Sequence, residues 1–446
     1  MAGGNFDINV GKVRPGTYVN TKSKRQMKPS GSSRGIVVLP LVGYDWGPDG
    51  QFIKISAESP DGEIVKLGRS VYDDNDSMLL IRETMKNAKT CYVYIINNGV
   101  KATATVEGLT ITAAYGGTRG NDIKVACTAN TAGGFDVTVY LGTEAVGSYN
   151  GVNTIADLIA ASNGGYVVFS AENASAALTA FASASLEGGT NGESSNAGVT
   201  TFLDKSESLK WNTMCFPLVD DSLQTACQTK IKYIRENAGK WVQVVMPNCG
   251  SDYEGIINVT NAVWLGDKEL TIPQACAWVA GATAAASRTE SNTYKEYEGA
   301  TAVSGEKTNE ESKLAIQNGE FFFSVSDEGK VVVEYDINSL HTFTTEKTPD
   351  YAKNRVMRVY DSFAEDLALT FPPNKYDNST DGWLVMEGLG KALLKNYEDA
   401  GAIDNVDLDN DFYVDQSRSV GDETYFCVGL QAIDSAEKLY FSVSTR

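Results

Sequence analysis

The stretch from residue 348 to residue 373 constrains the fold most, because it predicts one long helix with both ends marked. Thr348 suits an N-cap and Pro349 suits the first helical position, while the prolines at 372 and 373 end the helix near Phe371. Apolar residues recur at three- and four-residue spacing and form a stripe that must pack on another element, namely Ala352, Val356, Val359, Tyr360, Phe363, Leu367 and Phe371.

The charges of this predicted helix oppose its dipole. Basic side chains at 353, 355 and 358 lie near the positive end, and acidic side chains at 361, 365 and 366 lie nearer the negative end. Such an arrangement costs roughly 0.3 kcal/mol or more per charge on an isolated helix. Either another surface supplies compensating charges, or these side chains form a solvated polar face.

The overall charge argues against two classes of function. The chain carries a formal net charge of -19, whereas wrapping nucleic acid or lying on an anionic membrane requires clustered Lys and Arg. The richest basic run, residues 22–28, lies beside turn residues and is interpreted as a solvated loop. We therefore expect no nucleic-acid partner and no membrane insertion.

The cysteines and the N-terminus indicate folding in a cytoplasm. Seven cysteines are scattered without CxxC spacing, mostly in apolar runs, so buried free thiols in a reducing compartment are expected. Residues 1–14 contain no apolar signal core, and the most apolar helical stretch, residues 275–286, is too short to span a bilayer. A chain of 446 residues should form about two to four domains.

The order of predicted elements indicates an α/β core interrupted by a β-rich insertion. A buried strand at 35–43, a helix at 73–87 and a strand at 91–96 suggest a βαβ-type unit. Ala, Gly, Thr and Ser dominate between about 100 and 193, where the predicted elements are strands at 103–112, 122–129 and 135–141, a short helix at 154–161 and a glycine-rich exit linker at 188–192.

The α/β pattern resumes from residue 200. The predicted elements are strands at 211–219, 241–246 and 256–265, helices at 221–237 and 273–286, and a hairpin joining 321–325 to 331–335. A second C-terminal helix is capped by Asp381 and ends before Gly401, and strands at 424–430 and 438–444 close the chain. Short strands at both termini, including residues 6–10, invite pairing with another sheet.

No catalytic or metal-binding constellation can be assembled from the sequence. His341 is the only histidine, and residues 31–35 match GxSxG without the strand and helix that a nucleophile elbow needs. Four aspartates between 407 and 415 have calcium-loop spacing, but Phe412 and Arg418 stand where glycine and glutamate are required, so a charged edge strand is expected instead. No GxGxxG or Walker-type motif occurs, and no cofactor is expected.

Several short motifs, taken together, resemble the contractile tail sheath family of myophages, prophages and phage-tail-like bacteriocins. Each is weak alone, but their order spans nearly the whole chain: Arg-Pro-Gly-Thr-Tyr-Val at 14–19, Asp-Trp-Gly-Pro at 45–48, Gly-Gly-Thr-Arg-Gly-Asn-Asp-Ile at 116–123, Leu-Glu-Gly-Gly-Thr-Asn-Gly at 186–192, Ile-Ile-Asn-Val-Thr-Asn at 256–261, Val-Ala-Gly at 279–281 leading to Ser-Asn-Thr-Tyr at 291–294, Asn-Arg-Val-Met-Arg at 354–358 and Glu-Lys-Leu-Tyr at 437–440.

The resemblance implies a helical sheath of stacked six-subunit rings around an inner tube, which switches from an extended to a contracted state. The subunit would be an α/β and α+β multidomain chain: an α/β middle domain (21–99 and 196–345), an inserted β-rich outer domain (100–195), and a C-terminal α+β assembly domain (346–446) completed by terminal strands. An N-terminal arm, residues 1–20, would join the last domain. Arms that cross to neighbouring subunits agree with the strand-like termini, and a head-to-tail contact that does not close generates a helix.

The resemblance also assigns candidate interface residues. Donated and receiving strands would place these side chains between subunits: Phe6, Ile8, Val10, Tyr425, Phe426, Val428, Leu439, Tyr440, Phe441 and Val443. One of the two C-terminal helices should face the tube, and the candidates are Arg355, Arg358, Lys391, Lys395 and Glu398. The expected partners are copies of the chain, the inner tail tube protein, and the baseplate and tail terminator proteins, in a virion tail assembled in the host cytoplasm.

Two other functions are alternatives. A surface-layer or other tube-forming protein would also self-assemble, although a surface-layer protein would carry a secretory signal. An enzyme with a site in the α/β core, such as a hydrolase, would need a nucleophile and a base that the sequence does not bring together. Within the sheath family, the same motifs fit a phage, a resident prophage, a bacteriocin or a related injection machine.

Overall fold

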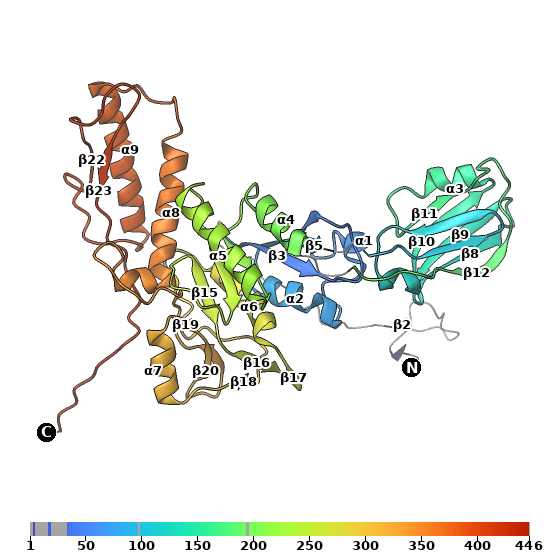
Figure 1. Ribbon diagram of the computed structural model, residues 1–446, viewed down its shortest axis with the longest axis horizontal. Helices are drawn as coiled ribbons and strands as arrows, with labels where there is room; N and C mark the ends of the chain where they lie inside the picture. The colour runs from blue at the N-terminus through green and yellow to red at the C-terminus, as the bar shows by residue number, and fades with distance from the viewer. Residues whose placement is uncertain (1–2, 5–16, 19–33, 97–98, 193–195, 446) are drawn as a thin grey trace.

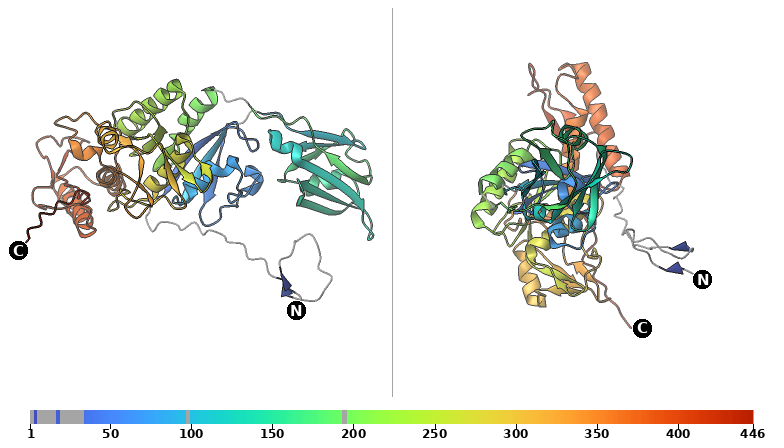
Figure 2. Two further views of the ribbon diagram at one scale, coloured as in Figure 1. Left: turned by 90° about the horizontal axis from the view of Figure 1, so that it is seen from below. Right: turned by 90° about the vertical axis from the view of Figure 1, so that its right-hand side faces the viewer.

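The computed structural model describes residues 3–4, 17–18, 34–96, 99–192 and 196–445. Three parts follow one another along an elongated molecule, with a β-sandwich at one end, an α/β core in the middle and a helical C-terminal part at the other end (Figure 1, Figure 2). The mixed α/β multidomain class is confirmed. The predicted strand at 6–10, the basic loop at 22–28 and the serine of the GxSxG match lie outside the described residues.

A seven-stranded sheet forms the α/β core. Its order is β19-β15-β14-β13-β3-β5-β4, and all neighbours are parallel except β4 and β5. The strands are β3 (Ile36–Val42), β4 (Gln51–Ser56), β5 (Thr90–Ile96), β13 (Thr213–Cys215), β14 (Gln243–Pro247), β15 (Ile256–Val259) and β19 (Glu320–Phe321). The predicted parallel pair at 35–43 and 91–96 is confirmed, whereas the edge strand β4 was not predicted.

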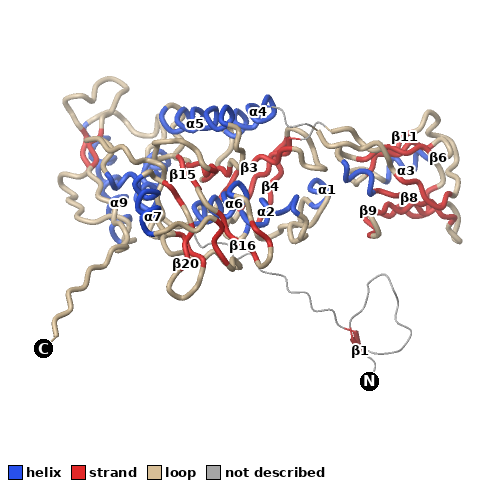
Figure 3. The backbone as a smooth tube through the Cα atoms, turned by 60° about the horizontal axis from the view of Figure 1, so that its bottom comes forward, coloured by secondary structure: helices blue, strands red, loops and turns tan. Residues whose placement is uncertain are grey.

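Helices cover both faces of this sheet (Figure 3). Val37 and Leu39 of β3 belong to the cluster under α2 and α6, whereas Val38 belongs to the cluster under α4 and α5, as buried parallel strands require. An added Cβ at Gly281 would lie 2.3 Å from the Thr84 carbonyl oxygen, so glycine permits close packing of α6 on α2. The bounds are α1 (Ile64–Leu67), η1 (Asp76–Met78), α2 (Leu79–Met85), α4 (Asn196–Ser206), α5 (Asp221–Glu236) and α6 (Ile272–Ala285).

Two small sheets lie beside the core. They contain β16 (Ala262–Leu265), β17 (Lys268–Glu269) and β18 (Ala302–Ser304), and the confirmed hairpin β20 (Phe323–Val325) and β21 (Val331–Val333), with α7 (Asn309–Gln317) nearby. The predicted single strand at 256–265 was wrong, because it divides between β15 and β16. Asn261 lies at the division, where its amide group exchanges two hydrogen bonds of 2.8 Å with the main chain of Phe323.

The β-sandwich consists of a four-stranded sheet, β10-β9-β8-β12, and a three-stranded sheet, β11-β7-β6. The single strand predicted at 103–112 was wrong: Glu107 and Gly108 have φ angles of 49° and 75° and form a tight turn between β6 and β7. The elements are β6 (Thr103–Val106), β7 (Leu109–Ala113), η2 (Thr118–Asp122), β8 (Ile123–Ala129), β9 (Phe135–Leu141), β10 (Glu144–Val152), α3 (Ile155–Ala161), β11 (Val167–Ser170) and β12 (Phe181–Ser185).

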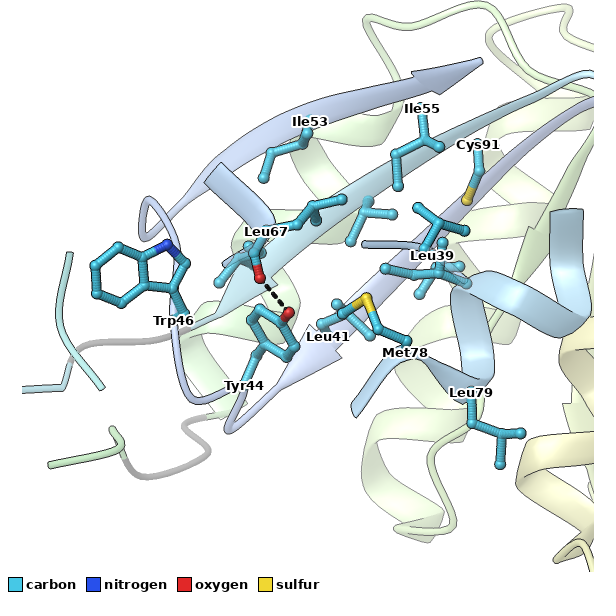
Figure 4. Close-up of a cluster of buried hydrophobic side chains, with 14 of the residues drawn as sticks. Leu39, Leu41, Tyr44, Trp46, Ile53, Ile55, Leu67, Met78, Leu79 and Cys91 are labelled. Carbon is cyan, nitrogen blue, oxygen red and sulfur yellow. Dashed lines mark hydrogen bonds between the residues drawn. The ribbon is translucent and has the colours of Figure 1, made fainter. Parts of the chain in front are cut away.

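A tight junction around Trp46 joins the sandwich to the core. The buried Trp46 ring lies 5.5 Å from the Tyr115 ring and 5.9 Å from the Tyr166 ring between centroids, and its N–H donates to the Val65 carbonyl at 2.8 Å. An added Cβ at Gly117 would lie 1.9 Å from the Asp45 carbonyl oxygen, so the two chain segments touch. Figure 4 shows Trp46 at one side of the buried cluster that also contains Leu39, Leu41 and Ile53.

The C-terminal part contains η3 (Pro349–Ala352), α8 (Asn354–Thr370), α9 (Thr380–Asp399), β22 (Phe412–Val414) and β23 (Phe426–Val428). The predicted single helix from Pro349 was wrong at its start, because Lys353 has extended angles (φ -87°, ψ 119°) that separate η3 from α8. Its end at Phe371 is confirmed. The cap of α9 is Ser379, whose hydroxyl accepts the Gly382 N–H at 3.2 Å, and not Asp381.

Candidate assembly surface

Exposed apolar side chains are concentrated in the last hundred residues. Among described residues, more than half of the large apolar side chains that are exposed lie beyond residue 346. Leu439, Tyr440, Phe441 and Val443 are 66%, 90%, 83% and 90% exposed. Contiguous apolar side chains in this position mark a surface for interaction with another protein, since soluble monomers rarely leave such a group uncovered.

We define residues 438–445 as the terminal arm. The strand predicted at 438–444 is absent, since the described arm has no regular structure and runs away from the rest of the chain (Figure 1). The physical reason is that no described strand lies beside the arm to accept its main-chain hydrogen bonds. An apolar, alternating segment without a partner is the expected state of a strand that is completed by another subunit.

The strand β23 presents an open edge. It pairs only with β22 among the described strands, and Tyr413 lies opposite Cys427. Gly429 N–H donates to the Asp411 carbonyl and Asp415 N–H donates to the Tyr425 carbonyl, so the main-chain groups of Phe426 and Val428 point away from β22. The strand predicted at 424–430 is therefore shorter, at three residues, but its outer edge can accept a further strand.

A set of polar contacts, the arm root, holds the chain just before the arm. Ser291 Oγ donates to a Glu437 carboxylate oxygen at 2.8 Å, and Lys353 forms an ion pair with the same carboxylate. Arg355 donates to Ser435 Oγ at 2.6 Å. Lys353 and Glu437 side chains are both 8% exposed, so the pair is largely removed from water. The arm therefore begins at a defined point and leaves in a defined direction.

Next to the arm root, the buried carboxylate of Asp336 ties α8 to the core. Arg358 donates to it at 2.8 Å, the Asn354 amide at 2.9 Å and the Asn292 N–H at 2.9 Å. The side chains of Arg358 and Asp336 are 1% and 0% exposed. Burial alone would raise the pKa of Asp336, but Arg358 and the hydrogen bonds outweigh it and hold that pKa below its ordinary value.

This depressed pKa predicts an acid-labile fold. A carboxylate whose pKa is lowered in the folded state stabilises the protein above its unfolded pKa of about 4 and loses that contribution as the pH falls through the folded value. We expect the free energy of unfolding to fall between about pH 5 and about pH 2, and to fall less steeply in Asp336→Asn. Urea unfolding of the wild type and of Asp336→Asn at both pH values measures this difference. If the free energy of unfolding fell equally with pH in the two proteins, the lowered pKa of Asp336 would be refuted.

Charges from the core compensate those of α8. Arg235 of α5 donates to both Asp361 carboxylate oxygens at 2.9 and 2.8 Å, with both side chains 7% exposed, and Arg288 lies 3.4 Å from Asp366. The compensating surface that the sequence offered as one explanation therefore exists. The buried ion pair of Arg235 with Asp361, the more exposed pair of Arg288 with Asp366 and the Asp336 contacts join α8 to the core in this chain.

Only some of the predicted tube-facing residues remain accessible. Arg358 was a wrong candidate, because its guanidinium is buried against Asp336, and Arg355 is half-buried at the arm root. On α9, Lys391 is half-buried. Lys395 forms surface ion pairs with Glu398 at 2.9 Å and with Asp399 at 3.0 Å. The same helix exposes Leu384, Val385 and Leu389, which were not predicted.

The packing of α9 on β22 makes a direct prediction. An added Cβ at Gly390 would lie 2.1 Å from the Phe412 ring, whereas one at Gly388 would meet nothing within 4 Å. We expect Gly390→Ala to destabilise the chain by about 1–3 kcal/mol, reduced by a helix-propensity gain of about 1 kcal/mol. Gly388→Ala is the matched control: its added methyl group meets no neighbour, so only the gain in helix propensity remains and the variant should be slightly stabilised. Urea midpoints of both variants provide the measurement, and equal midpoints would contradict the packing.

The cysteines and the acidic segment at 407–415 can also be compared with their predicted roles. Cys91, Cys127, Cys215, Cys227, Cys249 and Cys276 are buried free thiols as predicted, and Cys427 is half-buried. Among the described residues no group of three or more His, Cys, Asp or Glu could hold a metal ion, and no described helix is long and apolar enough to cross a membrane. The predicted charged edge strand is only partly formed: Asp407 and Asp411 close a turn through main-chain N–H groups, and the strand begins at Phe412.

Sequence reasoning missed most of the residues that hold the arm, and it missed the buried Asp336 beside them. Ser291, Lys353, Asp336 and Glu437 were not named as site residues, yet three of the quoted motifs, at 291–294, 354–358 and 437–440, meet at this point. The available signal was the unusual charge order of the helix that begins at 354. Phe6, Ile8 and Val10 lie outside the described residues.

Comparisons with known proteins give matches over nearly the whole chain. Four phage tail sheath families match it: the central domain at 192–339, the C-terminal domain at 346–446, the beta-sandwich domain at 97–191 and the Gp18 domain III N-terminal region at 34–95. The phage-like element PBSX protein XkdK of Bacillus subtilis (strain 168) is 36% identical over 475 residues, covering 99% of each chain.

Solved structures agree with these matches. The sheath tail protein of Desulfitobacterium hafniense has a TM-score of 0.81 at 37% identity and covers 96% of this chain and 99% of its own. The anti-feeding prophage helical sheath in its contracted state has a TM-score of 0.56 at 13% identity, covering 98% of this chain and 100% of its own. The second likeness concerns the fold alone.

Proposed function

The chain belongs to the phage tail sheath family and is a subunit of a contractile tail sheath, and from this premise we propose how it assembles. Each subunit donates its terminal arm to the open edge of β23 in a neighbour. The observation that carries this proposal is the coexistence, in one chain, of an exposed apolar arm without a partner and a strand edge that no described strand covers. Repeating this head-to-tail contact without closure generates a helical polymer.

Helix α9 is proposed as the tube-facing element. The apolar side chains of α8, such as Val356, Val359 and Phe363, are buried within the subunit. Its charged residues Arg358 and Asp361 form buried ion pairs with Asp336 and Arg235, so little of α8 remains for contact with a partner. In contrast, α9 exposes Leu384, Val385 and Leu389 in its first half and the charged group of Lys395 and Glu398 near its end. A mixed apolar and charged helix face suits a protein partner better than water.

Contraction is proposed to move the core and α8 as one body. The buried contacts of Asp336 and Arg235 tie them together, whereas the described arm beyond Glu437 is held only through Lys438, whose ammonium lies 5.5 Å from the centre of the Tyr335 ring. Subunits could then rotate and slide while the donated arms act as tethers, with bistable interfaces as the switch and no nucleotide. A difference of a few kcal/mol per subunit, on the order of that needed to reverse a two-state equilibrium, would add up over many subunits.

Several finer features belong to the same proposal. We propose the domain limits 21–99 with 196–345, 100–195 and 346–446, with residues 1–20 as a second arm that carries Phe6, Ile8 and Val10. The partners would be copies of the chain, an inner tube protein, and baseplate and tail terminator proteins, with assembly in the host cytoplasm. The role is structural and not enzymatic, as expected of a member of a structural protein family.

Electron microscopy of the purified chain at rising concentration tests the proposal. We expect hollow helical tubes from the full chain and none from versions lacking residues 1–20 or 438–446, with unchanged circular dichroism. Tubes that persist in both deletions would place assembly on the domain faces and end the strand-donation proposal. The control is Lys438→Ala, which changes the arm but keeps all of its apolar residues. This variant should form tubes as the full chain does.

A further inference from the structure

An apolar cavity lies on one face of the pair β22 and β23, and Phe426 and Val428 of the open-edged strand line part of it. Its volume is about 340 Å³, and it is lined by Trp241, Ala364, Leu367, Ala368, Phe371, Phe412, Phe426 and Val428. An apolar cavity of about 150 Å³ is enough to hold a benzene ring. The walls come from the core, from α8 and from the same face of β22 and β23, so a side chain entering it would touch three elements together.

The terminal arm supplies a matching side chain. A strand added to β23 places alternate residues on one face, so Leu439, Phe441 and Val443 share a face while Tyr440 points to the other. The apolar set would face the cavity, and Phe441 is its central and largest member. We propose that Phe441 of a second copy of this chain fills the cavity; the inference rests on the proposed strand donation and names its anchor.

The chain's own arm cannot supply this residue. After Val428 the chain runs beside α8 toward its N-terminal end, since Ser435 contacts Arg355 and Glu437 contacts Lys353. Ala364 is the residue of α8 that lines the cavity nearest to the start of this helix. It follows Lys353 by eleven residues, which is about 17 Å at the helical rise per residue. Phe441 is four residues beyond Glu437, and a reversal would use at least two of them, which leaves a reach of about 7 Å. A second copy is therefore the occupant.

Truncation of Phe441 tests its role as the anchor. We expect Phe441→Ala to raise the concentration needed for tube formation by about thirtyfold, as loss of an interface hot spot does, while Tyr440→Ala changes it little. If the arm deletion abolishes tubes but Phe441→Ala forms them as readily as the full chain, strand donation stands and the cavity assignment is refuted.

Disulfide trapping tests the position and the second copy. In a Cys427→Ser background, one chain carries Phe441→Cys and another Ala368→Cys, and they are mixed under mild oxidation at concentrations where the unaltered chain assembles. We expect a covalent dimer, and much less of it when Tyr440→Cys replaces Phe441→Cys. A bridge within a diluted chain that carries both cysteines, or equal trapping from positions 440 and 441, would overturn the proposal.

Discussion

Replacement of Asp336 by alanine is expected to reduce the free energy of unfolding by about 3–5 kcal/mol, the cost of leaving a buried charge without its partner. Arg358 is 1% exposed and would keep its charge inside the protein without the carboxylate. The Asn354 amide and the Asn292 N–H would lose their acceptor as well. The shift of the urea midpoint at pH 7 measures this loss.

Two further variants separate charge from packing at Asp336. Asp336→Asn keeps the shape and should fall between the wild type and Asp336→Ala. Lys395→Ala removes the two surface ion pairs of that lysine on α9 and should leave the midpoint almost unchanged, because exposed pairs contribute little. An Asp336→Ala protein as stable as the wild type would mean that the contact between α8 and the core does not stabilise the fold.

Val428→Pro is expected to abolish tube formation while the subunit stays folded. The Val428 N–H points to the open edge, so proline removes a donor that an incoming strand needs and costs β22 no hydrogen bond. Val428→Thr keeps the N–H and the β-branched shape and should assemble. Pelleting and electron microscopy, at concentrations about tenfold above the wild-type threshold to allow for a 1.4 kcal/mol loss, provide the measurement.

Mixing two defective chains extends this test. A chain without residues 438–446 can receive but not donate, and Val428→Pro can donate but not receive. Each mixed pair can form one contact between a terminal arm and a β23 edge, and then has no free terminal arm and no free β23 edge. We therefore expect dimers and no tubes. Tubes from this mixture would show that polymer growth does not pass through the β23 edge.

The long periodic elements could be predicted from the sequence, because their signals are local. The parallel strands β3 and β5 and the helices α5 and α6 follow from apolar runs and from helical spacing. The failures came where one or two residues interrupt a regular pattern. Lys353 breaks the predicted helix, and the Glu107–Gly108 turn divides a predicted strand.

The arrangement of the assembly surface depends on contacts that local patterns do not contain. Arg358 looks like a surface charge in the sequence, and only the distant Asp336 shows that it is buried. The arm looks like a strand and is a strand only if a partner completes it. The opposed charges of α8 were a local sign of a compensating surface, and the ion pair of Arg235 with Asp361 shows that the chain's own core supplies it.

A cryo-electron microscopy map of the assembled polymer, at a resolution that traces the main chain, tests strand donation most directly. Strand donation predicts that residues 438–444 of one subunit run beside β23 of a neighbour, with main-chain hydrogen bonds to Phe426 and Val428. A map in which the β23 edge is empty, and the arm contacts only its own subunit or solvent, would contradict it.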